Sequence, residues 1–148
     1  IIVSFSPWIL NKISNENKYN FKNLTINILI PTSVVIVSGY YFFGKKLIEI
    51  IAGSGFMNSY TPMLILLVGY MSYYLTFWTR HFLLLNNLIL KHTKGRIVNL
   101  AVFLATSPFL ISNYGFNGIA LAISLSILLQ KIYELSVYFK NKNIENNI

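Results

Sequence analysis

Uncharged apolar runs alternate with short charged segments along the whole chain. The longest uninterrupted stretch covers residues 61–90, in which 19 uncharged residues precede Arg80 and His81. As a single helix these residues would be about 45 Å long, more than the roughly 30 Å hydrocarbon core of a bilayer. The pattern therefore predicts one long spanning helix with Arg80 well inside it. A charge at that depth usually faces protein or a water-filled cavity.

The other apolar runs predict the rest of the architecture. Residues 1–10 resemble the end of a preceding span, and three further runs predict complete spans at residues 24–43, 96–112 and 117–139. Pro31 lies inside the first of these spans and predicts a kink there. We therefore expect an all-α, polytopic transmembrane helix bundle with four complete spans.

Two connections have a pattern of their own. The apolar residues Leu47, Ile48, Ile50 and Ile51 alternate with the charged residues Lys45, Lys46 and Glu49. This amphipathic pattern predicts a short helix near residues 47–52 that lies in the outer interface. The segment KHTKGR at residues 91–96 is expected to form a basic turn.

Composition supports a membrane protein and excludes an ordinary soluble domain. Charged residues are 11% of the chain and hydrophobic residues 55%, whereas soluble domains have about 25% charged residues. The net charge is +8, but the basic residues separate apolar runs. We interpret them as topology signals and contacts to anionic lipid, not as a nucleic-acid site. Because the chain starts inside an apolar run, we expect a piece of a longer protein.

The distribution of Lys and Arg predicts the orientation. Taking the connections alternately, eight Lys and Arg residues fall on one side of the membrane and two, Lys45 and Lys46, on the other. The positive-inside rule places the first side in the cytoplasm. We expect a multi-pass protein of the inner (cytoplasmic) membrane with its C-terminus in the cytoplasm.

The titratable residues predict neither an enzyme nor a metal or cofactor site. The chain has no Asp and four Glu, and no two carboxylates are placed for acid–base catalysis inside a cavity. His81 and His92 have no carboxylates at ligand spacing, and the chain has no Cys. Lys131 and Glu134 are three residues apart, and we expect a local ion pair whose Lys reaches the interface.

The segment NYGFNG at residues 113–118, followed by IALAIS, is similar to a YG-x-x-G-x-A-x-A stretch. That stretch opens the last helix of polysaccharide flippases in the multidrug/oligosaccharidyl-lipid/polysaccharide exporter superfamily. The glycines and Phe of residues 43–56 and the basic turn followed by Asn99 also fit, so the resemblance covers nearly the whole chain. Physically, Gly115 can take a left-handed conformation to reverse the chain, and Gly118 lets the last helix start close to its neighbour.

The resemblance implies a fold and an activity. Such transporters have twelve or fourteen helices in two bundles, and this chain corresponds to the C-terminal part of the second. The implied function is translocation of a lipid-linked oligosaccharide or polysaccharide precursor across the cytoplasmic membrane by alternating access. The implied partners are the bilayer, the lipid-linked substrate and the missing N-terminal helices. Alternatives are a drug or lipid-precursor exporter of the same superfamily, a membrane-embedded polysaccharide polymerase or ligase subunit, and an anchoring bundle without substrate.

Two polar lines predict the substrate-binding residues. On the long helix, Tyr73, Thr76 and Arg80 share a face with Gly69 and Asn87. On the next helix, a polar residue recurs every seven positions, at Asn99, Thr106 and Asn113. Our hypothesis is that both lines face one cavity. There Arg80 would bind the pyrophosphate or an acidic sugar of the substrate, and Tyr73 would offer its ring to a sugar. The alternative is that Arg80 reaches the inner headgroups.

Overall fold

The computed structural model describes residues 25–145, and within that range every regular element is helical. A π-helical turn, η1 (Thr25–Leu29), leads into α3 (Ile30–Ala52). The 3-10 helix η2 (Ser54–Ser59) then connects to α4 (Tyr60–Leu75), the short helix α5 (Phe77–Leu85) and α6 (Ile89–Glu145). The predicted all-α class is confirmed, while the expected end of a span at residues 1–10 lies outside the described residues.

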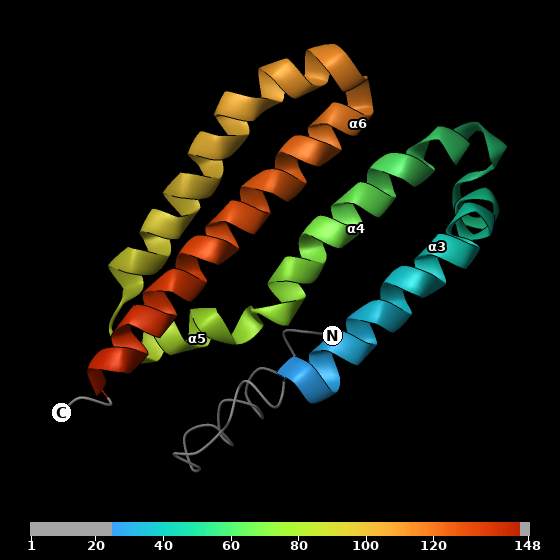
Figure 1. Ribbon diagram of the computed structural model, residues 1–148. Helices are drawn as coiled ribbons and strands as arrows, with labels where there is room; N and C mark the ends of the chain where they lie inside the picture. Colours follow the sequence, from blue (N-terminus) through green and yellow to red (C-terminus); the bar gives the residue numbers. More distant parts are fainter. Residues whose placement is uncertain (1–24, 146–148) are drawn as a thin grey trace.

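Two segments have the length and composition needed to cross a membrane. They are Asn27–Ala52, which is mostly α3, and Ile89–Asn141, which is most of α6. The second segment is not one straight rod. Figure 1 shows α6 as a hairpin whose two arms run side by side. We call residues 89–114 its first arm and residues 116–145 its second arm.

The hairpin reverses at Gly115, where φ is +56° and ψ is −128°. These angles match the first central residue of a type II′ turn, which side chains with a Cβ disfavour. The chain therefore reverses at Gly115, the residue at which the sequence predicts the reversal. Three residues later the two arms are in close contact. A Cβ added at Gly118 would collide with the backbone carbonyl of Leu110, so only a glycine fits at this position.

The second arm of α6 lies between the first arm and α4, as Figure 1 shows. Small residues permit the close approach to α4: a Cβ at Gly69 would come within 2.8 Å of the Ser124 Cα. The Ser124 hydroxyl also donates to the carbonyl of Ile65 at 2.9 Å. Ala120 and Ala122 are almost completely buried in this arm. The core of the described residues is therefore centred on the second arm.

Helix α3 packs against α4 along one narrow face. Near one end, the hydroxyls of Thr32 and Tyr74 lie 2.7 Å apart. Near the other end, the rings of Tyr40 and Tyr60 stack with centroids 5.7 Å apart. Most of the large apolar side chains of α3 are exposed, including Val35. The contact between α3 and α4 thus uses hydroxyl groups and aromatic rings.

The expectation of one helix over residues 61–90 is wrong. Helix α4 ends at Leu75, and Thr76 has non-helical angles (φ −117°, ψ 21°) while its hydroxyl donates to the Ser72 carbonyl at 2.6 Å. Helix α5 then takes a different course and lies across the end of the α6 hairpin (Figure 1). The ring of Tyr138 holds it there, with edge contacts to Trp78 at 4.7 Å and Phe82 at 4.6 Å.

Two further local expectations need correction. Residues 47–52 do not form a separate interfacial helix but continue α3, which ends before Gly53 with its φ of +89°. Residues 91–96 are not a turn but the beginning of α6, because Asn87 supplies the reversal with a φ of +56°. Pro31 lies in the first turn of α3, directly after the π-helical turn η1, so the helix geometry changes next to the proline.

Candidate functional site

A buried carboxylate, Glu134, sits on the second arm of α6 and is 0% exposed. Two neighbours on the same arm donate hydrogen bonds to its carboxylate oxygens. Lys131 Nζ lies 2.7 Å from Oε2, and Gln130 Nε2 donates to Oε1 at 2.9 Å. Lys131 and Gln130 are themselves buried. The pair is therefore an interior ion pair, and the expectation that Lys131 reaches the interface is wrong.

Three other segments bring side chains to this pair. From α5, the Thr79 hydroxyl lies 3.2 Å from Oε2 of Glu134. From the first arm of α6, His92 Nδ1 lies 3.2 Å from Oε1. From α4, the hydroxyl of Tyr73 donates to Gln130 Oε1 at 2.9 Å. We call these six residues the Glu134 cluster.

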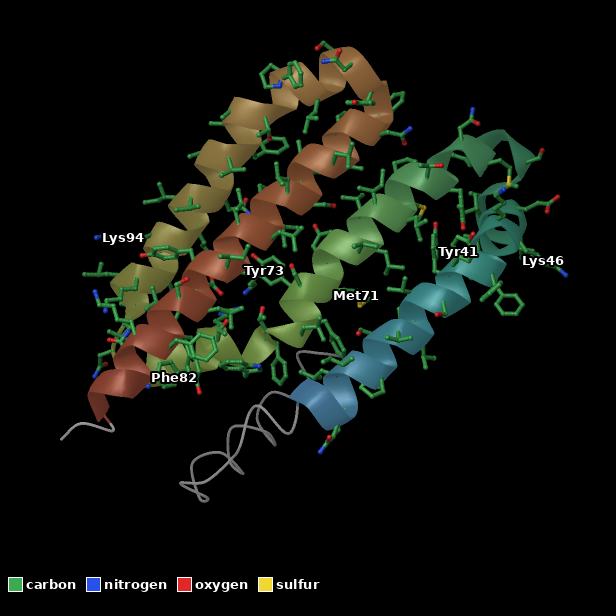
Figure 2. The ribbon with its side chains drawn as sticks, in the orientation of Figure 1. Tyr41, Lys46, Met71, Tyr73, Phe82 and Lys94 are labelled. Carbon is green, nitrogen blue, oxygen red and sulfur yellow. The ribbon has the colours of Figure 1, made fainter. Side chains whose placement is uncertain are left out.

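The ring of Tyr73 gives Lys131 a second partner. Lys131 Nζ lies 4.0 Å from the ring centroid, which is within cation–π range. Figure 2 shows Tyr73 reaching from α4 toward α6. A buried charge is costly unless it is paired and hydrogen-bonded. The Glu134 cluster meets this condition through contacts between four helical segments, so it also fixes how those segments fit together.

The surroundings of the cluster are cationic. Arg80 on α5 and Arg96 on the first arm both act electrostatically on Lys131 and on His92. Arg80, Arg96 and Lys131 together carry three positive charges against the single negative charge of Glu134. A further anion close to this end of the bundle would be attracted.

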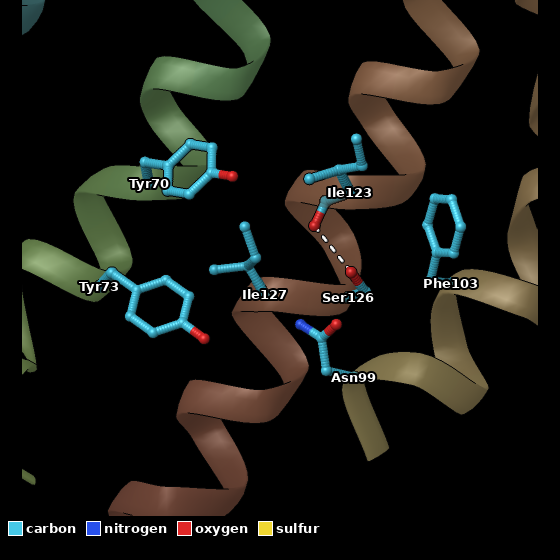
Figure 3. Close-up of a pocket in the computed structure, with 7 residues that line it drawn as sticks. All are labelled: Tyr70, Tyr73, Asn99, Phe103, Ile123, Ser126 and Ile127. Carbon is cyan, nitrogen blue, oxygen red and sulfur yellow. Dashed lines mark hydrogen bonds between the residues drawn. The ribbon is translucent and has the colours of Figure 1, made fainter. Parts of the chain in front are cut away.

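An open pocket of about 440 Å³ adjoins the cluster. Figure 3 shows Tyr70 and Tyr73 entering it from α4, while Asn99 and Phe103 enter from the first arm of α6. The second arm forms the floor, with Ile123, Ser126 and Ile127. The rings of Tyr70 and Tyr73 have centroids 6.4 Å apart. Tyr73 belongs to both the pocket and the cluster, so the two are contiguous.

The structure brings two of the predicted binding residues together. Tyr73 and Asn99, from the two predicted polar lines, line the same pocket. Thr106 is half-buried on the same arm as Asn99, but its hydroxyl donates to the Val102 carbonyl at 2.8 Å and it does not line the pocket. Thr76 lies at the break between α4 and α5.

Arg80 is not where the helical line predicts it. The line from Gly69 through Tyr73 is interrupted at Thr76, because α5 departs from the axis of α4. Arg80 is exposed on α5 and does not line the pocket. The structure therefore does not bring Arg80 together with Tyr73 and Asn99 in one pocket, although Arg80 acts electrostatically on Lys131.

Sequence reasoning missed the buried cluster. The sequence predicts for Glu134 a local ion pair with a Lys131 that reaches the interface, and it predicts no carboxylate partner for His92. A signal was available: Gln130, Lys131 and Glu134 put three polar groups on one turn of an otherwise apolar helix. Among the described residues, no group of three or more His, Asp and Glu side chains is close enough to hold a metal ion.

No protein-family model, curated protein or solved structure matches this chain.

Proposed function

We propose that this chain is part of a membrane transporter that moves a lipid-linked oligosaccharide or polysaccharide precursor across the cytoplasmic membrane. The observation that carries the proposal is the pocket of Tyr70, Tyr73, Asn99 and Ser126, which adjoins the Glu134 cluster with Arg80 and Arg96 nearby. Aromatic faces with nearby amide and hydroxyl groups suit a sugar ring. Guanidinium and ammonium groups suit its phosphate. One segment of membrane-crossing length, Ile89–Asn141, carries Asn99 and Ser126, while Tyr70 and Tyr73 lie on α4.

The proposed arrangement in the membrane follows from the positions of the charges. Arg80, Lys91, Lys94 and Arg96 all lie on α5 or in the first two turns of α6, whereas the Gly115 turn lies at the other end of the hairpin. We place the cationic end in the cytoplasm, with both arms of α6, α4 and α3 as four spans. In this arrangement the chain is the C-terminal part of a twelve- or fourteen-helix flippase-like transporter.

Cysteine accessibility tests this arrangement in the protein that contains this chain, with any Cys elsewhere replaced; these 148 residues contain none. In intact cells, an impermeant maleimide should label Tyr114→Cys at the turn and leave Lys94→Cys unlabelled until the membrane is opened. Both residues are exposed in the structure. Labelling of Lys94→Cys in intact cells would contradict the orientation.

Transport into proteoliposomes tests the function. The protein that contains this chain is reconstituted, and the translocation of a fluorescent lipid-linked oligosaccharide is measured. Tyr73→Ala should reduce the rate at least about tenfold, because one lost aromatic–sugar contact and one lost hydrogen bond each contribute on the order of 1 kcal/mol. The matched control is Tyr114→Ala, which removes an exposed Tyr at the turn and should leave the rate unchanged.

Two further outcomes distinguish the alternatives. Equal transport of a lipid diphosphate without sugar would favour a lipid-precursor exporter. Arg80→Ala should slow transport of the charged substrate and Arg80→Lys should restore part of it, because both cations attract phosphate but only guanidinium binds it bidentately. Wild-type transport by both Arg80→Ala and Tyr73→Ala would reject the proposed function.

A further inference from the structure

Two hydrogen bonds in series connect the buried carboxylate to the pocket. Gln130 Nε2 donates to Oε1 of Glu134 at 2.9 Å, and the hydroxyl of Tyr73 donates to Oε1 of Gln130 at 2.9 Å. Gln130 and Glu134 are both almost completely buried, so neither has solvent as an alternative partner. Tyr73 lines the pocket, and Figure 3 shows its hydroxyl directed away from α4.

The carboxylate fixes the direction of both bonds. Glu134 is ionised in its pair with Lys131, whose Nζ lies 2.7 Å from Oε2, and an ionised carboxylate only accepts. Gln130 must therefore turn its NH₂ group toward Glu134, because its amide oxygen would face another oxygen there. The amide oxygen is left on the side of Tyr73, so the Tyr73 hydroxyl has to donate its proton to Gln130.

The bond from Tyr73 to Gln130 is costly to give up. Among the residues that the structure describes, Tyr73 is the one donor to Oε1 of Gln130. If Tyr73 turned its proton toward a ligand, this buried oxygen would be left without a donor. The resulting loss of affinity for that ligand would be about five- to 100-fold.

The hydroxyl of Ser126, in the same pocket, is not fixed in this way. It donates to the carbonyl of Ile123 at 2.8 Å, as Figure 3 shows. That carbonyl lies inside α6, where it can also accept the backbone N–H four residues further on. Ser126 can therefore turn its proton toward a ligand without leaving a buried acceptor unpaired. Of these two hydroxyls, only that of Tyr73 has a fixed direction.

A hydroxyl whose proton is committed offers only lone pairs to the pocket. A ligand group that contacts the Tyr73 oxygen must therefore bring its own proton, which excludes the acceptor-only oxygens of an ionised phosphate or carboxylate. A cationic donor is disfavoured as well, because Lys131 Nζ lies 4.0 Å from the centroid of the Tyr73 ring. A neutral donor such as a hydroxyl satisfies both conditions.

We propose that Glu134, acting through Gln130, makes the Tyr73 oxygen a fixed acceptor, and that the pocket thereby selects a neutral hydroxyl of its ligand at this position. Gln130 is a positioning residue, since it contacts Tyr73 and does not line the pocket. The identification of the ligand as a sugar rests on the proposed function. The phosphate of the same substrate then binds away from the Tyr73 oxygen.

A spectrum of the protein without ligand tests the direction of the bond. The resonance Raman doublet of tyrosine distinguishes a hydroxyl that donates from one that accepts. Subtracting the spectrum of Tyr73→Phe isolates Tyr73 in the protein that contains this chain, held in lipid nanodiscs. Tyr73 should give the signature of a donor. An acceptor signature overturns the proposal, and this wild-type result needs no further variant.

Two variants, each measured against its own Tyr73→Phe counterpart, sharpen the spectrum. Gln130→Leu removes the acceptor and should shift Tyr73 away from the donor signature. Ser126→Ala is the matched control from the same pocket and should leave the signature unchanged. A Gln130→Leu protein that folds and keeps the wild-type signature would overturn the role of Gln130.

Transport of modified substrates tests the selection of a hydroxyl. In the fluorescent lipid-linked oligosaccharide, the sugar hydroxyls are replaced one at a time by fluorine, which cannot donate. One replacement should raise KM about fivefold in the wild-type protein and in Ser126→Ala, but not in Tyr73→Phe, which lacks the acceptor. If no replacement raises KM more in the wild type than in Tyr73→Phe, the selection is wrong. Because the spectrum needs no ligand, it decides the direction of the bond even where the transport assay rejects the proposed function.

Discussion

The two helix contacts of α4 are built differently, although both join apolar helices. On one side, α3 buries three residues, Ser33, Gly44 and Ile48, and meets α4 through hydroxyls and stacked rings. On the other side, the second arm of α6 buries Lys131 and Glu134 and brings small residues against α4. A contact with buried charges fits in one register, because any shift leaves a charge unpaired. We therefore expect α4 and α6 to form the fixed unit and α3 the more weakly held one.

The largest expected difference between the two contacts concerns their lysines. Lys131→Met removes the cation beside buried Glu134 and should lower the free energy of unfolding by about 3–5 kcal/mol. Lys45→Met on α3 removes only an exposed ammonium 5.4 Å from the ring of Tyr60, and should cost less than about 1 kcal/mol. The measurement is unfolding in mixed detergent–SDS micelles followed by circular dichroism. Equal losses for the two variants would remove the distinction between the contacts.

A second comparison uses two helical glycines. Gly118→Ala places a Cβ against the Leu110 carbonyl, so the arms of α6 must separate, at a cost of about 3 kcal/mol. Gly39→Ala on α3 places a Cβ in open space, and should raise the stability by about 0.5–1 kcal/mol through better helix propensity. The same unfolding assay measures both. A neutral Gly118→Ala would show that the hairpin arms are not in close contact.

The turn of the hairpin gives a smaller effect of a different origin. A Cβ at Gly115 meets no atom within 4 Å, so Gly115→Ala should cost about 1–3 kcal/mol through its φ of +56° alone. Gly55, in the connection between α3 and α4, is equally open but has no positive φ. Gly55→Ala should change the stability by less than about 0.5 kcal/mol. If both variants lose the same stability, backbone strain at Gly115 is not the cause.

The smallest expected effect tests the hydroxyl contact of α3. Thr32→Val removes the partner of the Tyr74 hydroxyl and should cost no more than about 1 kcal/mol. Thr93→Val on α6 is the control, since the exposed Thr93 bonds only the Ile89 carbonyl of its own helix. In a thermal unfolding experiment in detergent, Thr32→Val should have a lower unfolding temperature than Thr93→Val. A loss as large as that of Lys131→Met would mean that α3 is held as firmly as α6.

The helices of the fold could be predicted from the apolar periodicity of the sequence, whereas the breaks between them could not. The apolar runs located the helices, and the glycines of NYGFNG located the reversal of α6. The break at Thr76 was missed because Thr inside an apolar run does not by itself end a helix. It ends here because α5 docks on Tyr138, a residue more than sixty positions away. The turn at Asn86 and Asn87 had a local signal, since Asn tolerates a positive φ, but the adjacent basic segment was preferred.

The candidate site, like the fold, could be predicted from the sequence only in part. Helical spacing put Tyr73 and Asn99 on two polar lines, and both residues line the same pocket. It failed for Arg80 because the line crosses the break at Thr76. It also failed for Glu134, because a charge pair at i, i+3 is the same in sequence whether it is buried or exposed. Burial is decided by Tyr73 and Thr79, which lie 57 and 55 positions from their hydrogen-bond partners.

The spacing of Gln130, Lys131 and Glu134 has a consequence for how the protein is made. Glu134 finds its first two partners three and four residues earlier on its own helix. During synthesis these contacts form as soon as the second arm is helical, before α4 is in place. In the proposed membrane arrangement, the arm can thus enter the bilayer as a neutral ion pair and not as a bare charge. Tyr73 and Thr79 are made earlier, so their hydrogen bonds to Gln130 and Glu134 can form only when this arm packs against α4 and α5.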